Sequence, residues 1–176
     1  IIRAVAGNFI VAGFVYGLVQ YVIILVLFTL IYREIAPSAD FLFPALMMAF
    51  MSLFLMVSLF SGDFLFTYYL FLSGFHVGAF VMALISLWLG LKYLSRPSKN
   101  IQFILFAIIA VSLASDLLFL FMFSIPYGAV LLYHLLARHQ VRSGKTLITL
   151  GLASMAGLMI YWARVQRVRW MPNRLK

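Results

Sequence analysis

Hydrophobic residues run along this chain in long, nearly unbroken stretches that are separated by a few short polar turns. A helix that crosses a membrane needs about 20 predominantly apolar residues. The first stretch is long enough for one crossing; it ends at Arg33 and Glu34 and is followed by a polar turn around Pro37. The pattern predicts an all-α, polytopic transmembrane helical bundle with no sizeable soluble domain.

Two of the apolar stretches are too long for a single helix. Residues 41–94 need two helices, with a break near Ser61–Asp63 or near Ser73 and Gly74. Residues 101–138 exceed one ordinary span, and Pro126 favours a break there because proline suits the first turn of a new helix and disrupts an existing one. We therefore prefer six spans, followed by a basic interfacial tail at 165–176: 9–32, 43–66, 70–94, 101–122, 125–138 and 146–164.

A five-span interpretation keeps residues 101–138 as one long kinked helix. The positive-inside tendency favours this alternative, because it places most of the basic residues on one side of the membrane. Helix length and Pro126 favour six spans. In either case, small residues in the last span suit close helix packing: Gly151, Ala153, Ala156 and Gly157.

Composition excludes several classes of protein. Hydrophobic residues make up 66% of the chain and charged residues 10%, with a mean hydropathy of +1.12, against about 45–50% and about 25% in ordinary soluble domains. A soluble enzyme, a nucleic-acid-binding domain and a disordered tail are therefore excluded. We expect an integral protein of a bacterial-type inner membrane or of an organelle membrane.

Charge and cysteine content narrow the possible partners. The net charge is +9, and the Lys and Arg residues lie almost entirely between or after the apolar runs, where they would face phosphate headgroups rather than nucleic acid. The absence of cysteine excludes disulfides, thiolate metal sites and iron–sulfur clusters. We expect the bilayer, its headgroups, and other membrane subunits or a second copy as partners. The chain begins at Ile1 without a methionine, and we expect its natural start upstream.

Few ionisable side chains fall inside the predicted spans, and such groups are functional candidates by default because their insertion is costly. Asp63 lies near the end of the second span, His76 about two turns into the third, and Asp116 well inside the fourth. Two carboxylates and an imidazole at one membrane face suit general acid–base chemistry, because a low-dielectric site separates their pKa values. The structural alternatives are a helix cap or turn for Asp63 and a hydrogen bond to a neighbouring helix for Asp116.

Other candidate sites concern cofactors and headgroups. His76 and His134 do not lie at matched depth, as a bis-histidine b-type haem site would require, so we predict neither a cofactor nor a metal. The basic tail predicts an interfacial segment whose cations contact headgroups and whose tryptophan acts as an anchor: Arg164, Arg167, Arg169 and Trp170.

A partial family resemblance adds one hypothesis. The segment Ser58–Leu65, with its Gly62-Asp63 pair, Gly74, the Ser115-Asp116 pair and Tyr133–Ala137 follow one another in an order that resembles the YhhN/TMEM86 lysoplasmalogenase-like membrane family. That family is longer, with about eight spans, and a His that it carries after the Gly-Asp motif would fall near Met82. The resemblance implies that one of Asp63 and Asp116 would protonate a lysophospholipid vinyl ether and the other would assist water attack.

Three functions remain open from the sequence. The preferred one is a non-catalytic membrane subunit or small transport or sensor module. The alternative is an intramembrane lipid hydrolase that uses Asp63 and Asp116. A further alternative is a proton- or solute-conducting protein that uses the same residues.

Overall fold

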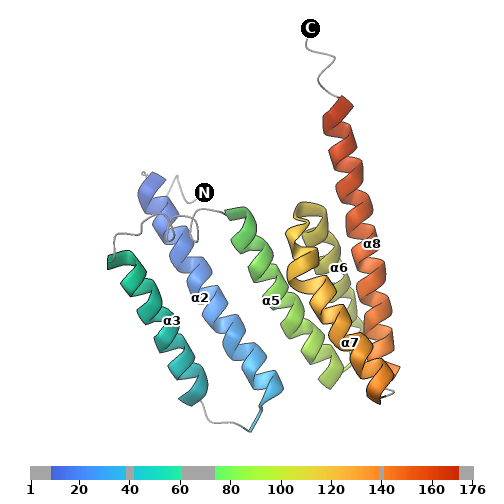
Figure 1. The fold of residues 1–176 in the computed structure, drawn as a ribbon, viewed down its shortest axis with the longest axis horizontal. Helices are drawn as coiled ribbons and strands as arrows, with labels where there is room; N and C mark the ends of the chain where they lie inside the picture. The colour runs from blue at the N-terminus through green and yellow to red at the C-terminus, as the bar shows by residue number, and fades with distance from the viewer. Residues whose placement is uncertain (1–8, 39–41, 61–73, 139–140, 171–176) are drawn as a thin grey trace. The chain divides into compact units, whose positions relative to one another are not determined.

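A computed structural model describes residues 9–38, 42–60, 74–138 and 141–170 (Figure 1). These residues form helices and connecting turns, and no strand occurs among them, which confirms the all-α prediction. In chain order the elements are α2 (Phe9–Ile35), α3 (Leu42–Phe60), α5 (Gly74–Ser95), α6 (Lys99–Ser115), the π-helical turn η1 (Leu120–Ser124), α7 (Ile125–Arg138) and α8 (Val141–Trp170).

The helices belong to two compact units, Ile1–Leu84 and Ile85–Lys176, and each is described by itself. In the first unit, α2 and α3 lie side by side, and the Tyr21 hydroxyl shares a hydrogen bond with the Ser52 hydroxyl. The ring of Tyr32 stacks on Phe43 with centroids 5.5 Å apart. The second unit contains the end of α5 together with α6, η1, α7 and α8.

Several helices have the length and apolar character that a membrane span requires. Four such segments are found in the described part of the chain: Val15–Ile35, Gly78–Ser95, Leu120–Ala137 and Ser143–Arg167. Helix α6 is apolar but has only 17 residues, which corresponds to a length of about 25 Å. The membrane character of the chain follows from these helices, whereas six spans stays a prediction.

Helices α6 and α8 run parallel to each other and make the most extensive contact in the second unit. Gly157 of α8 lies directly against α6, because a Cβ at this position would be 2.7 Å from both the Ala110 carbonyl oxygen and the Leu113 Cβ. Ala153, one turn earlier, is completely buried. The expected close packing is confirmed at Ala153 and Gly157, but not at Gly151, where a Cβ would meet nothing within 4 Å.

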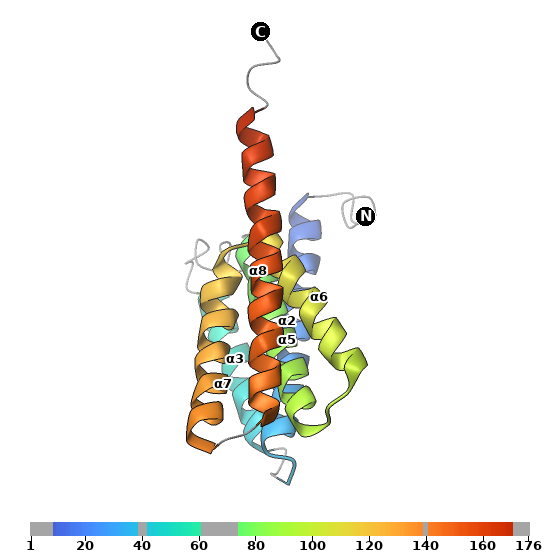
Figure 2. The ribbon, with the colours of Figure 1, turned by 90° about the vertical axis from the view of Figure 1, so that its right-hand side faces the viewer.

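Helix α7 runs antiparallel to α8, since a Cβ at Gly128 would meet Leu150 and one at Gly144 would meet Leu135. In Figure 2, α8 lies between α6 and α7 and continues beyond both towards the C-terminus. The centre of this unit is filled by side chains that are almost fully buried: Leu105, Ile109, Leu113, Phe119 and Leu131. Gly90 of α5 leaves room for the Tyr127 ring, whose hydroxyl a Cβ would meet.

The chain reverses direction about ten residues before the predicted break. Helix α6 ends at Ser115, and η1 leads directly into α7 with Pro126 inside the helical segment. The Ile125 N–H bonds to the Leu120 carbonyl in the wider π geometry, which accommodates the missing proline N–H and its steric demand on the preceding turn. Helix α7 has the bounds of the predicted span 125–138, with Pro126 in its first turn, while the apolar segment that is long enough to cross a membrane begins five residues earlier, at Leu120.

Candidate functional site

The structure describes the three predicted ionisable residues to different extents. Asp63 lies outside the described residues. His76 is the third residue of α5, and its side chain is also outside what is described. Only Asp116 is described completely, so a shared site formed by these three residues stays a prediction.

Asp116 is the cap between two helices. Its backbone is extended (φ −149°, ψ 118°), and its N–H bonds to the Ser112 carbonyl at 2.8 Å, which closes α6. Its carboxylate Oδ1 accepts the Leu118 N–H at 2.8 Å, which is the bond that an N-cap side chain makes to the second residue of a helix. A negative charge at a helix N-terminus is further favoured by the helix dipole.

The depth of Asp116 follows from the alignment of α6 with α8. The two parallel helices are aligned by the Gln102–Thr149 hydrogen bond and by the contacts of Gly157 with Ala110 and Leu113. Each residue of α6 is therefore level with the residue of α8 that lies about 46 positions later in the sequence. Asp116 is therefore level with about Trp162 of α8, where the aromatic and basic residues begin. The expectation that Asp116 lies well inside a span was wrong, because α6 ends there.

A polar network that the sequence analysis did not anticipate joins three helices. The Gln102 amide of α6 donates to the Thr149 hydroxyl of α8 at 2.8 Å, and the Tyr93 hydroxyl of α5 donates to the Gln102 amide oxygen at 3.5 Å. Thr149 in turn donates to the Lys145 carbonyl at 3.0 Å. Such bonds stabilise helix packing in membranes. A glutamine in an apolar run was the available signal.

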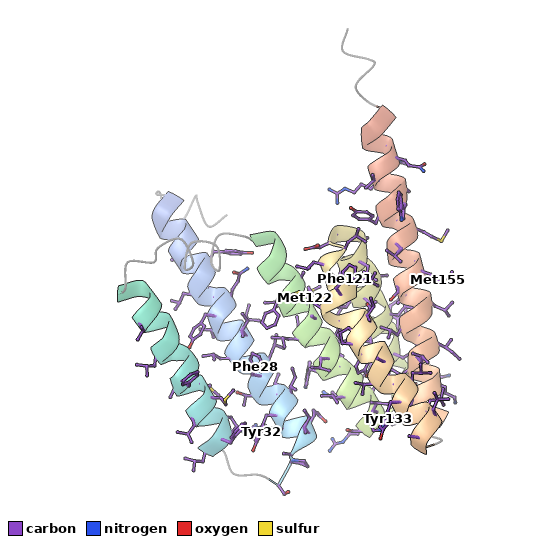
Figure 3. The ribbon with its side chains drawn as sticks, viewed as in Figure 1. Phe28, Tyr32, Phe121, Met122, Tyr133 and Met155 are labelled. Carbon is purple, nitrogen blue, oxygen red and sulfur yellow. The ribbon has the colours of Figure 1, made fainter. Side chains whose placement is uncertain are left out.

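The side of α8 that faces away from α6 carries a continuous row of apolar side chains. Each is more than half exposed, and the spacing of four, three, four and three residues places them on one helix face: Ile148, Leu152, Met155, Met159 and Trp162. We call this row the outer stripe of α8, and Figure 3 shows Met155 pointing away from the helices of its unit. Gly151 lies beside the stripe, and a Cβ there would meet nothing within 4 Å.

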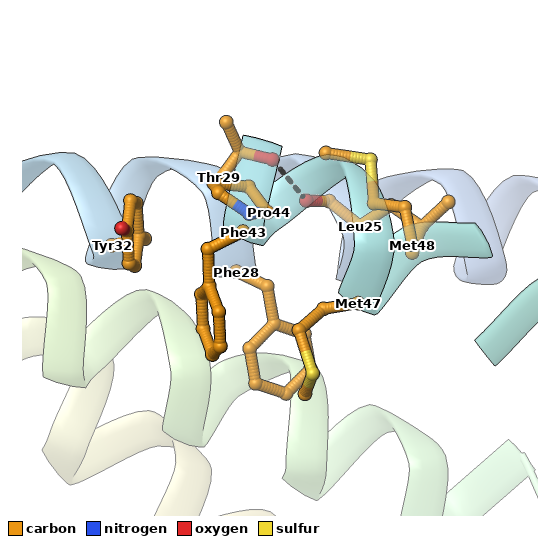
Figure 4. A pocket seen from close by; sticks show the side chains of 8 residues that line it. All are labelled: Leu25, Phe28, Thr29, Tyr32, Phe43, Pro44, Met47 and Met48. Carbon is orange, nitrogen blue, oxygen red and sulfur yellow. Dashed lines mark hydrogen bonds between the residues drawn. The ribbon is translucent and has the colours of Figure 1, made fainter. Parts of the chain in front are cut away.

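A small apolar cavity lies between α2 and α3 (Figure 4). Its volume is about 110 Å³, and it is lined by Leu25, Phe28, Thr29, Tyr32, Phe43, Pro44, Met47 and Met48. The Thr29 hydroxyl donates to the Leu25 carbonyl of its own helix at 2.9 Å. The lining therefore suits hydrocarbon, and it brings no group of acids or bases together.

The remaining candidates lie on α7 and on the last turns of α8. His134 is partly buried, and its ring meets Tyr133 edge-on, with centroids 5.8 Å apart. Among the described residues, no group of three or more His, Cys, Asp or Glu side chains is placed to hold a metal ion. Arg164 and Arg167 are exposed, while Arg169 and Trp170 belong to α8 and their side chains are not described.

Comparison with models of known protein families, with curated proteins and with solved structures gives no match for this chain. The resemblance to the lysoplasmalogenase-like family therefore stays a prediction.

Proposed function

We propose that this chain is a non-catalytic integral membrane subunit or small transport or sensor module that acts by packing its helices against membrane partners and lipid. The observation that carries this proposal is the outer stripe of α8. The opposite side of the same helix is fully used for packing, at Ala153 and Gly157 against α6, so the stripe is a second, separate face.

The composition of this face favours a helix as its partner. Small residues allow two helix backbones to approach closely in a membrane, where van der Waals packing drives association. Gly151 provides such a position next to Leu152 and Met155, and the space over it is open. The row also has the 3.5-residue period of helices that pack along their length.

Because the chain contains no cysteine, a single introduced cysteine can carry a photoreactive group into this face. We expect Met155→Cys, labelled with a benzophenone maleimide in native membranes, to give a discrete cross-linked adduct after illumination. Phe103→Cys is the matched control, because Phe103 is an equally apolar side chain that is 73% exposed on α6. Adding Gly151→Leu should abolish the adduct, since the larger side chain blocks close approach.

Purification completes this test. A subunit should leave the membrane with stoichiometric partners in mild detergent, and the adduct should contain one of them or a second copy. The proposal would be contradicted by equal cross-linking from Met155→Cys and Phe103→Cys, or by a chain that purifies as a stable monomer without partners.

A further inference from the structure

Charge is distributed very unevenly between the two units. Residues 85–176 contain eleven of the thirteen Lys and Arg residues but only one of the four acidic residues. That single acid, Asp116, lies at the C-terminal end of α6. We call the opposite end of this unit, where α5 ends and α6 and α8 begin, the loop end. The cations of the loop end therefore have no acidic side chain of their own unit nearby.

Three exposed cations of the loop end lie next to the polar network. Lys99 precedes Gln102 by three residues on α6, and Lys145 precedes Thr149 by four on α8, so each lies on the same helix face as its network residue. Because Gln102 and Thr149 are hydrogen-bonded, the two lysines lie on adjoining faces of the two helices. Each is about one helical turn closer to the loop end than its network residue.

The third cation comes from the α5–α6 connection. Arg96 follows Tyr93 by three residues, and its N–H bonds to the Lys92 carbonyl at 2.8 Å, which continues the helical turn. The Tyr93 hydroxyl reaches Gln102, so this turn is held beside the start of α6. Lys92 itself is engaged elsewhere, since its Nζ lies 4.8 Å from the centroid of the Trp88 ring.

We propose that Arg96, Lys99 and Lys145 form a binding site for the phosphate of an anionic phospholipid. The network of Tyr93, Gln102 and Thr149 holds the three chain segments together, and the cations surround its outer side. This position corresponds to the headgroup layer, because the apolar parts of α6 and α8 begin immediately inward. Basic groups between the ends of membrane helices are suited to anionic headgroups. The site does not depend on the protein partner proposed for α8.

A lipid titration of the purified full-length chain tests the site. In uncharged detergent, phosphatidylglycerol should raise the thermal unfolding midpoint by about 2–4 °C, and phosphatidylcholine should raise it much less. The variant Lys99→Gln/Lys145→Gln should lose most of this shift, whereas Lys99→Arg/Lys145→Arg should keep it. High salt should reduce the shift in the unmodified protein, since the interaction is between exposed charges.

The matched control removes two cations from the other end of α8, which are expected to meet headgroups without a polar network behind them. Arg164→Gln/Arg167→Gln changes the net charge equally, and it should reduce the phosphatidylglycerol shift much less than the loop-end variant does. The proposal is overturned if the loop-end variant keeps its shift, if phosphatidylcholine is equally effective, or if only the control variant loses the effect. Suppression of the shift by soluble glycerol phosphate would assign the site to free anions instead of lipid. Circular dichroism verifies that each variant is folded.

Discussion

Asp116 lies at the boundary of two helices, and its carboxylate accepts a backbone N–H of the second helix. Asparagine can make the same bond, and alanine cannot. We therefore expect Asp116→Asn to leave stability almost unchanged and Asp116→Ala to lower the free energy of unfolding by about 1 kcal/mol. Reversible unfolding in mixed micelles, followed by circular dichroism, measures both changes.

The same pair of variants separates capping from catalysis. If Asp116 acted as an acid or base on a lysophospholipid vinyl ether, Asp116→Asn would abolish turnover although the fold was intact. Asp63→Asn provides the companion variant for the resemblance-based hypothesis. Turnover that survives both substitutions excludes the hydrolase alternative, while equal instability of the Asn and Ala variants at position 116 would contradict the capping role.

Residue-level patterns marked Asp116 as a candidate site residue but did not predict that it caps a helix. Its scarcity as an acid in an apolar region drew attention to it. The capping signal was incomplete, because Phe119 stands where a capping box would carry Glu or Gln. The Gln102–Thr149 bond depends on the alignment of helices far apart in sequence, which local patterns do not contain.

At the scale of the helix, α8 contains two glycines in opposite surroundings. Gly157 is pressed against the α6 backbone, and Gly151 faces open space. Gly157→Ala should therefore force α6 and α8 apart and destabilise the fold by about 1–3 kcal/mol. Gly151→Ala should be neutral or stabilising by up to about 1 kcal/mol, because alanine is the better helix former.

Unfolding of the two alanine variants under identical conditions tests this difference, and each glycine serves as the control for the other. Equal effects would contradict the assigned orientation of α8. Combining Gly151→Leu with the cross-linking experiment then distinguishes loss of a partner from loss of the fold, because this substitution should leave the isolated chain stable.

The helices themselves were predicted better than their ends. Long apolar runs are sufficient to indicate membrane helices, because the backbone must satisfy its hydrogen bonds within the apolar layer and a helix does so within its own segment. Pro126 stands in the first turn of α7 as predicted, but the π-turn at Leu120–Ser124 leads directly into this helix, so the proline does not mark the reversal of the chain. The reversal at Asp116 interrupts the apolar run only with the Ser115-Asp116 pair and leaves little trace in hydropathy.

At the scale of the whole molecule, the reversal at Asp116 makes the choice between five and six spans testable. Helices α6 and α8 are parallel and α7 is antiparallel to both. If α6 and α7 each cross the bilayer, Ser98 and Lys145 lie on the same side, and Gln166 lies on the other. If residues 101–138 crossed once as a kinked helix, Ser98 and Gln166 would share a side and Lys145 would be opposite.

Single cysteines at these three positions measure the arrangement directly, because these 176 residues supply no competing thiol. All three positions are exposed, so an impermeant maleimide should label Ser98→Cys and Lys145→Cys from one side of sealed vesicles and Gln166→Cys only from the other. Labelling after permeabilisation controls for reactivity at each site.

The pairing of Ser98 with Gln166 would show that α6 is too short to cross, since its 17 residues span only about 25 Å of a hydrocarbon layer about 30 Å thick. The expected pairing requires the bilayer to thin locally around α6, at a cost of fractions of a kcal/mol per Å, which the packing of Gly157 and Ala153 against this helix can offset.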